Sequence, residues 1–82
     1  MNAALDLNHI QNAYKAILST FVMLDTAPGN YANIHQFTDV RSRYQGGYFN
    51  AALERLIDEG HVEFFNNRFL RLQPSGYILA HS

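Results

Sequence analysis

The sequence contains no cysteine, which excludes disulfide bonds and zinc sites built from thiolates. It also has no apolar run close to the ~18 residues that a membrane-spanning helix requires. No basic segment followed by an apolar one marks a signal peptide. We therefore expect a cytoplasmic protein, of cellular or viral origin, that has no membrane partner.

Basic residues are scarce, and acidic residues slightly outnumber them. The chain has six Lys and Arg against seven Asp and Glu, which is a formal net charge of −1. A nucleic-acid-binding domain usually has a basic surplus. Residues 1–40 hold one base, Lys15, against three aspartates, whereas residues 41–82 hold five arginines against four acidic side chains. The second half is thus slightly basic, and charge leaves nucleic acid and protein partners both open.

No residue pattern indicates catalysis or metal binding. The four histidines show no metal-ligand spacing, and no two of them lie four residues apart on one helix. Neither glycine-rich turn has the lysine and the spacing of a phosphate loop. Asp58 and Glu59 are adjacent, so they point to different sides of a helix and cannot act as a facing acid–base pair. We predict a protein that is not an enzyme and that uses no cofactor.

Apolar and aromatic side chains, in contrast, are abundant. The chain is 48% hydrophobic, with six Phe and five Tyr. A chain of 82 residues forms one domain. A domain this small buries only ~60–65% of the surface that its unfolded form exposes, so its core must be dense in apolar residues. We predict a single domain over residues 1–82.

The first third of the chain predicts a helix, a turn and a second, shorter helix. Asn8-His9-Ile10-Gln11 has the pattern of a capping box. The residues that follow have apolar side chains at three- and four-residue intervals, which is typical of an amphipathic helix: Leu7, Ile10, Tyr14, Ile17, Leu18, Phe21 and Leu24. Pro28-Gly29-Asn30 predicts a turn. We expect a short helix over 32–38 that buries Ile34 and Phe37, and a connecting turn over 39–44.

A third helix is predicted from Gln45 to Glu59, because Gly60 is suited to the left-handed position after a helix end. Its apolar stripe consists of Phe49, Ala52, Leu53, Leu56 and Ile57. The sequence after Gly60 predicts a hairpin over 62–72.

The alternation of side chains in this hairpin favours a three-residue loop, Asn66-Asn67-Arg68. In that register Val62 pairs with Leu72 and Phe64 with Leu70 on the inner face, and the outer face holds the pairs Glu63–Arg71 and Phe65–Phe69. A two-residue turn would instead pair apolar with charged side chains, Val62 with Arg71 and Leu70 with Glu63. Pro74 is suited to the first position of a last short segment, whose residues Tyr77, Ile78 and Leu79 we expect to pack on the first helix.

Two motifs in this region carry a resemblance to a known family. Leu53, Leu56 and Gly60 form Leu-x-x-Leu-x-x-x-Gly, and Leu72-Gln73-Pro74-Ser75-Gly76 follows the hairpin, with Gln73 in place of a capping Thr. Their order and spacing resemble those of winged-helix domains. The resemblance implies an α+β fold with three helices, a two-stranded hairpin wing and a short C-terminal segment. It also implies that the helix over 45–59 is a recognition helix for double-stranded DNA.

On that basis the candidate DNA-binding residues lie before the recognition helix, on it and at the wing tip: Arg41, Arg43, Gln45, Tyr48, Asn50, Arg55 and Arg68. Arginines in such positions could hold phosphates on either side of a duplex, whereas in a structural role Arg55 would pair with Glu59 and Arg71 with Glu63. Glu54 and Asp58 lie on the same outward face, which is unusual for a surface that approaches phosphates.

Phe65 and Phe69 form the other candidate surface, because two aromatic rings on a solvent face favour a partner, most simply a second copy of the chain. Two hypotheses follow. The first, which we favour, is a small, dimeric, DNA-binding regulator of transcription. The alternative is a winged-helix module that does not bind DNA and grips a protein through Tyr48, Phe65 and Phe69, as an adaptor or inhibitor that a phage could encode.

Overall fold

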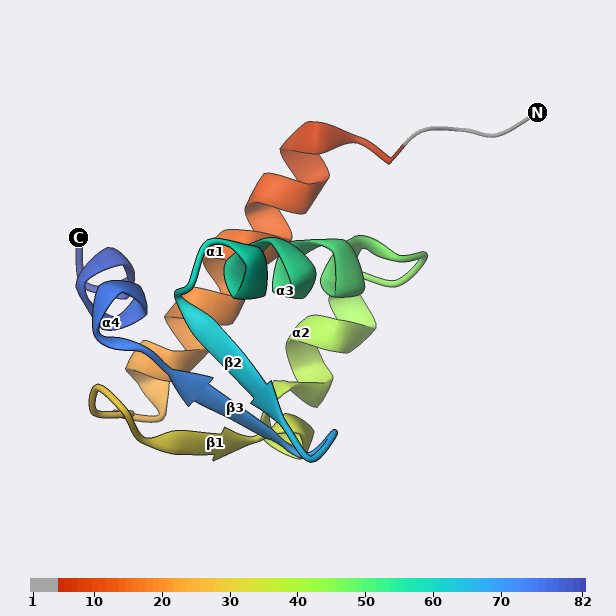
Figure 1. Ribbon diagram of the computed structural model, residues 1–82. Helices are drawn as coiled ribbons and strands as arrows, with labels where there is room; N and C mark the ends of the chain where they lie inside the picture. Colours follow the sequence, from red (N-terminus) through yellow and green to blue (C-terminus); the bar gives the residue numbers. More distant parts are fainter. Residues whose placement is uncertain (1–4) are drawn as a thin grey trace.

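Four α-helices and a three-stranded antiparallel sheet make up residues 5–82, the part of the chain that this computed structural model describes (Figure 1). The elements are, in order, α1 (Leu7–Met23), β1 (Tyr31–Asn33), the 3-10 helix η1 (Ile34–Phe37), α2 (Thr38–Arg43), α3 (Tyr48–Asp58), β2 (Val62–Phe65), β3 (Phe69–Leu72) and α4 (Pro74–Ala80). The strand order is β1-β3-β2. The predicted α+β class is confirmed, although the sheet has one strand more than the two predicted. The predicted domain includes residues 1–4, which lie outside the described residues.

α1 buries one face on the rest of the domain, as the spacing of its apolar residues predicted. Its N-cap is Asp6, whose carboxylate accepts a 2.9 Å hydrogen bond from the amide of Asn8. The predicted cap at Asn8 is therefore wrong, because Asp6 already satisfies that amide and Asn8 lies inside the helix. Leu7, expected on the buried face, is 77% exposed. The buried residues of α1 are Ala13, Tyr14, Ile17, Leu18 and Phe21.

The segment after the first turn differs most from the prediction. A helix over 32–38 and a turn over 39–44 were expected, but residues 31–33 form β1, residues 34–37 form η1 and residues 38–43 form α2. β1 is extended because it pairs antiparallel with β3, with Ala32 opposite Leu70. Asn33 then caps η1, since its side chain accepts from the amide of His35 and its own amide donates to Gln36 Oε1. The expected burial of Phe37 is confirmed, whereas Ile34 is only half-buried.

α3 starts three residues later than predicted, at Tyr48 rather than at Gln45. Gly46 and Gly47 have φ values of 81° and 95°, and a right-handed helix requires negative φ, so it cannot include them. The predicted end is confirmed, because Glu59 is the C-cap and Gly60 has a φ of 79°. The buried residues of α3 are Phe49, Ala52, Leu53 and Leu56, which are members of the predicted stripe.

The predicted hairpin register is confirmed at all four pairs, from Val62 opposite Leu72 to Phe65 opposite Phe69. Asn66 and Asn67 both have positive φ, 53° and 54°, as the loop requires. Phe64 departs from its expected burial and is 41% exposed. It lies near the hairpin tip, where it lines a surface hollow.

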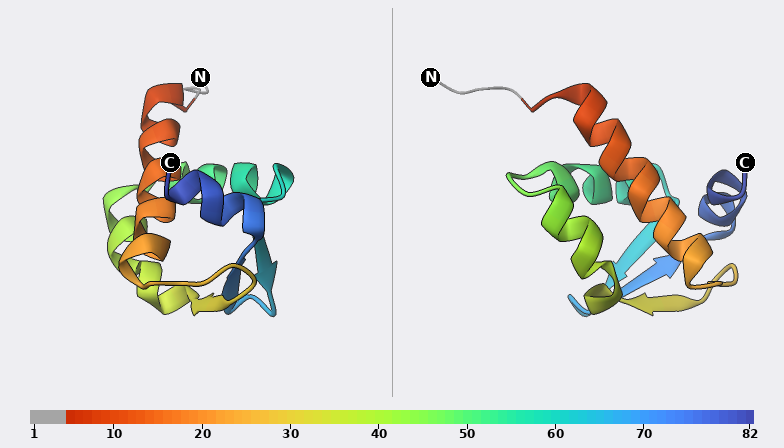
Figure 2. Two further views of the ribbon diagram at one scale, coloured as in Figure 1. Left: turned by 90° about the vertical axis from the view of Figure 1, so that its left-hand side faces the viewer. Right: turned by 180° about the vertical axis from the view of Figure 1, so that it is seen from behind.

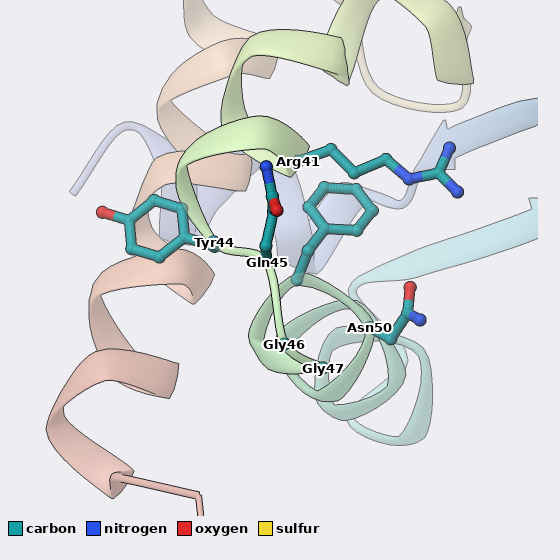
Figure 3. Close-up of a pocket in the computed structure, with 7 residues that line it drawn as sticks. Arg41, Tyr44, Gln45, Gly46, Gly47 and Asn50 are labelled. Atoms are coloured by element: carbon teal, nitrogen blue, oxygen red, sulfur yellow. The ribbon is translucent and has the colours of Figure 1, made fainter.

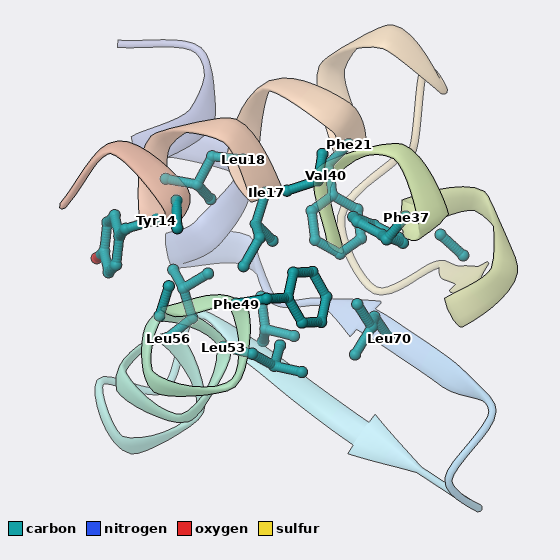
Figure 4. Packing of buried hydrophobic residues seen from close by; sticks show 14 of the residues in the cluster. Tyr14, Ile17, Leu18, Phe21, Phe37, Val40, Phe49, Leu53, Leu56 and Leu70 are labelled. Carbon is teal, nitrogen blue, oxygen red and sulfur yellow. The ribbon is translucent and has the colours of Figure 1, made fainter. Parts of the chain in front are cut away.

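The core lies between α1, α3 and the inner face of the sheet (Figure 4). Among its fully buried side chains are Phe21, Phe37, Leu56 and Leu70. α4 starts at Pro74 as predicted and lies beside α1 (Figure 2). Its residues Tyr77 and Ala80 pack against the core, but Ile78 is 70% exposed, so its predicted packing on α1 is wrong. Helical periodicity directs Ile78 away when its neighbour Tyr77 points inward.

Candidate nucleic-acid interface

The turn between α2 and α3 forms a surface hollow that contains three of the predicted site residues, Arg41, Gln45 and Asn50. Its volume is about 190 Å³, and Gly46 and Gly47 form part of its wall. In Figure 3 the side chains of Arg41 and Asn50 lie on the same side of the start of α3, whereas Tyr44 points the other way. The Arg41 guanidinium lies over the Phe49 ring, 6.0 Å from its centroid. This distance is at the outer limit of a cation–π contact, and within residues 5–82 the guanidinium has no carboxylate partner.

A second hollow continues this surface to the tip of the β2–β3 hairpin. Arg41 and Asn50 line it together with Asn67, and its volume is about 160 Å³. Its apolar floor consists of Ile34, Phe49, Leu53 and Phe64. We call the surface made by Arg41, Gln45, Asn50 and Asn67 the helix–hairpin face.

The five arginines of the second half fall into two groups. Arg55 Nε lies 3.2 Å from the Glu59 carboxylate, and Arg71 lies 3.5 Å from that of Glu63, so the two expected structural pairs are both present. Within residues 5–82, Arg41, Arg43 and Arg68 form no ion pair. These three are exposed and keep their charge available for a partner.

Two of the predicted DNA-binding residues face α1 instead of the helix–hairpin face. Arg55 also donates to Gln11 of α1, and its guanidinium lies over the Tyr14 ring, 5.2 Å from the centroid. The Tyr48 hydroxyl accepts a hydrogen bond from the amide of Asp6. The Tyr48 ring forms a T-shaped contact with the His9 ring, and the two ring centroids lie 4.4 Å apart. Both side chains connect α3 to α1.

The outward face of α3 has two carboxylates, as the sequence predicted. Glu54 and Asp58 are exposed and follow Asn50 at intervals of four residues, so the three side chains form one stripe along the helix. Within residues 5–82, neither carboxylate forms an ion pair. The stripe therefore changes from an amide at the start of α3 to negative charge at its end.

The outer face of the sheet holds the predicted pair Phe65 and Phe69, together with Tyr31 of β1. The Tyr31 ring centroid lies 6.0 Å from that of Phe65 and 6.2 Å from that of Phe69. These three rings line a hollow of about 300 Å³. Tyr48, which was predicted to join the pair, contacts α1 as described above. Tyr31 was missed because β1 is only three residues long, too short for its alternation to be recognised.

A polar network joins α1, α3 and α4 on another side of the domain. His61 Nδ1 lies 2.9 Å from Ser75 Oγ, which also lies 3.3 Å from the Gly60 carbonyl oxygen. His61 Nε2 lies 3.7 Å from Glu59, which accepts a hydrogen bond from Tyr14. This network connects the start of α4 to the end of α3.

Residues 5–82 contain no cluster of three or more His, Cys, Asp or Glu side chains that could hold a metal ion. No helix in this range is long and apolar enough to cross a membrane. Comparisons with protein-family models, with curated proteins and with solved structures gave no match.

Proposed function

We propose that the chain is a winged-helix domain that binds double-stranded DNA through the helix–hairpin face and acts as a small regulator of transcription. The observation that carries this proposal is that Arg41, which has no carboxylate partner within residues 5–82, lines the same two hollows as Asn50. Arg43 and Arg68 are further exposed bases without a carboxylate partner in that range. The element order supports the fold assignment, because α2 and α3 precede a hairpin whose second strand pairs with β1.

The first turn of α3 is the part that enters the major groove in this proposal. Recognition helices commonly contact base edges with their N-terminal residues, and Asn50 is the third residue of α3. Its amide can both accept and donate, which matches the edge of an adenine. No side chain caps this first turn, but the Phe49 amide already donates to the Tyr44 carbonyl, so a phosphate oxygen could accept only from the amides next to it.

The arginines hold the phosphates on either side of this contact. Arg41 lies beside Asn50 in both hollows, so it meets the strand next to the base that Asn50 reads. In this proposal the exposed bases Arg43, at the end of α2, and Arg68, in the β2–β3 loop, reach further phosphates. Glu54 and Asp58 then require that α3 enters the groove at a slant, so that its C-terminal half stays away from the phosphates.

The test is a salt titration of binding to random-sequence duplex DNA. The logarithm of the affinity should fall linearly with the logarithm of salt concentration, and each phosphate contact contributes about 0.9 to the slope. Arg41→Ala and Arg68→Ala should each reduce the slope by about one. Lys15→Ala is the matched control, since Lys15 is an exposed base on α1, and it should leave the slope unchanged. If the chain fails to bind duplex DNA at low salt, the proposal is wrong.

A second candidate function is supported by the carboxylates on α3. A recognition helix whose exposed stripe ends in Glu54 and Asp58 is better suited to a basic protein surface than to DNA. This candidate is the adaptor or inhibitor that does not bind DNA. It predicts no DNA binding at any salt concentration, so the same titration separates the two functions.

A further inference from the structure

The outer face of the sheet is the largest gathering of exposed aromatic rings in residues 5–82 that the proposed DNA contact does not use. Tyr31 and Phe65 are 50% and 52% exposed, and Phe69 is half-buried beside them. The opposite face of the same strands belongs to the core, where Val62, Leu70 and Leu72 are buried. The sheet therefore has the core on one side and a row of aromatic rings on the other. Exposing this second apolar surface to water is unfavourable, and such patches indicate interaction sites.

The charged residues beside the rings are balanced. Glu63 and Arg71 lie opposite each other on β2 and β3 and form an ion pair of 3.5 Å within the chain, and they are exposed to 57% and 40% of their side-chain areas. Arg71 is held in place, because its Nε donates to the Gly29 carbonyl at 3.0 Å and its guanidinium lies 5.6 Å from the Tyr31 ring centroid. This face therefore has one positive and one negative charge at fixed places, and no net charge.

Charge balance distinguishes between the possible occupants of the face. A nucleic acid would meet the Glu63 carboxylate, and a strongly basic or acidic protein would meet a like charge in Arg71 or Glu63. A second copy of the same face, turned by a two-fold axis, avoids both conflicts. Each Arg71 then meets the Glu63 of the other copy in addition to that of its own chain, as an isologous contact requires.

The hollow between the three rings can accept a ring of a second copy. Phe65 lines this hollow together with Tyr31 and Phe69, and it is about as exposed as Tyr31. Two copies related by a two-fold axis can each place Phe65 in the hollow of the other. Aromatic pairs of this kind are stabilised beyond what their buried area alone contributes.

We propose that two copies of this chain associate through the outer sheet face, with Phe65 as the central contact and with Glu63 and Arg71 paired across the interface. Strands of three and four residues make a small face, well below the ~800 Å² per partner of a standard interface. The association is therefore weak, with a dissociation constant between about 10 and 500 µM. It does not depend on whether the chain binds DNA.

The test is sedimentation equilibrium of the free chain over a range of concentrations that brackets these values. The weight-average mass should rise from that of one chain, 9.4 kDa, towards twice that value. Phe65→Ser should raise the dissociation constant more than about tenfold, because it removes the central ring. Met23→Ser is the matched control, since Met23 is 83% exposed on α1, and it should leave the association unchanged.

A charge exchange tests the pairing itself. Glu63→Lys and Arg71→Glu should each weaken self-association, whereas a mixture of the two variants should form a heterodimer that is tighter than either homodimer. If Arg71→Glu fails to fold, because it loses the bond to Gly29, Glu63→Lys alone should still weaken the dimer, and more strongly at low salt. A mass that stays at that of one chain throughout the range would overturn the proposal, as would a dimer that Phe65→Ser leaves intact.

Discussion

The Tyr14 hydroxyl donates a 2.5 Å hydrogen bond to the Glu59 carboxylate, which joins the middle of α1 to the C-terminal end of α3 across 45 residues. Arg55 reaches the same carboxylate from one turn earlier in α3. Because α1 and α3 form the main helix–helix contact of the domain, this bond connects the two helices at the edge of their apolar interface.

Tyr14→Phe should therefore lower the stability of the domain. The substitution keeps the buried ring and removes only the hydroxyl, so the loss reports the hydrogen bond. Bonds to charged groups contribute ~1.5–3 kcal/mol when well shielded, and Glu59 is partly exposed, so we expect a loss of about 1 kcal/mol. Thermal unfolding should show a midpoint lower by ~4–8 °C. An unchanged midpoint would show that solvent replaces the bond without cost.

The same bond makes stability depend on pH at the acidic end. The hydrogen bond from Tyr14, with help from Arg55, holds the pKa of Glu59 below its ordinary value of 4.5. A carboxyl whose pKa is depressed in the folded state stabilises the fold above its unfolded pKa, and this stability is lost as pH falls through the folded pKa. Chemical unfolding between pH 2 and pH 6 should therefore show a smaller acid-dependent loss for Tyr14→Phe than for the original chain.

At basic pH the same hydrogen bond makes the stability of the domain fall as pH rises. Burial and the bond to Glu59 raise the pKa of Tyr14 from 10.0 to about 12. A group whose pKa is raised stabilises the fold below its unfolded pKa, so this contribution should be lost as pH rises from about 10 to about 12. Tyrosinate absorbance should show one tyrosine that titrates near pH 12, and this step should disappear in Tyr14→Phe.

Gly76→Ala should destabilise the domain, although alanine is the better helix former. A Cβ at Gly76 would lie 2.2 Å from the carbonyl oxygen of His61, a backbone atom that cannot move alone. We expect α4 to shift, at a cost of about 1–3 kcal/mol. The neighbouring Ser75→Ala loses only the contacts to His61 and Gly60 and should cost ~0.5–1.5 kcal/mol. Urea unfolding that finds Gly76→Ala as stable as the original chain would contradict this packing.

Asn66 should tolerate glycine but not valine. Its φ of 53° lies in the left-handed region, where a β-branched residue is strongly disfavoured. Asn66→Val should lower stability by ~1–2 kcal/mol, whereas Asn66→Gly should change it by less than about 0.5 kcal/mol. Thermal unfolding of both variants measures the difference, and equal midpoints would mean that the hairpin loop rearranges freely.

Removing the negative charges of α3 should strengthen DNA binding if the proposed function is right. Glu54→Gln and Asp58→Asn keep the shape of the exposed stripe and abolish its repulsion of phosphates. We expect the double variant to bind random duplex about three- to tenfold more tightly at low salt, and the gain should shrink as salt rises. Fluorescence anisotropy with a labelled duplex measures it, and a gain that persists at high salt would point to a different cause.

Local patterns predicted the parts of the fold that depend on neighbouring residues. The stripe on α3, the stop at Gly60 and the hairpin register all follow from side-chain periodicity and from residues that accept positive φ. The register could be chosen because, of the two pairings considered, only one groups Val62, Phe64, Leu70 and Leu72 on one face and sets Glu63 against Arg71 on the other.

A local capping pattern was ambiguous where contacts with distant segments determine which residue caps a helix. The sequence Asn-x-x-Gln occurs at Asn8–Gln11 and again at Asn33–Gln36, and only the second forms a capping box. Asp6 takes the capping position ahead of Asn8, whereas the pairing of β1 with β3 leaves Asn33 extended and ready to cap η1. Nothing within either stretch distinguishes the two.

By itself the sequence determined most of the buried faces of α1 and α3, the hairpin and its register, because these follow from patterns among residues close in the chain. Only the tertiary structure decided that Tyr31 joins Phe65 and Phe69, that Asn67 joins Arg41 and Asn50, and that Arg55 and Tyr48 face α1. Each of these depends on strand pairing or helix packing between segments far apart in sequence. The free energy of such contacts comes from burial across the whole domain, and no local pattern of residues contains it.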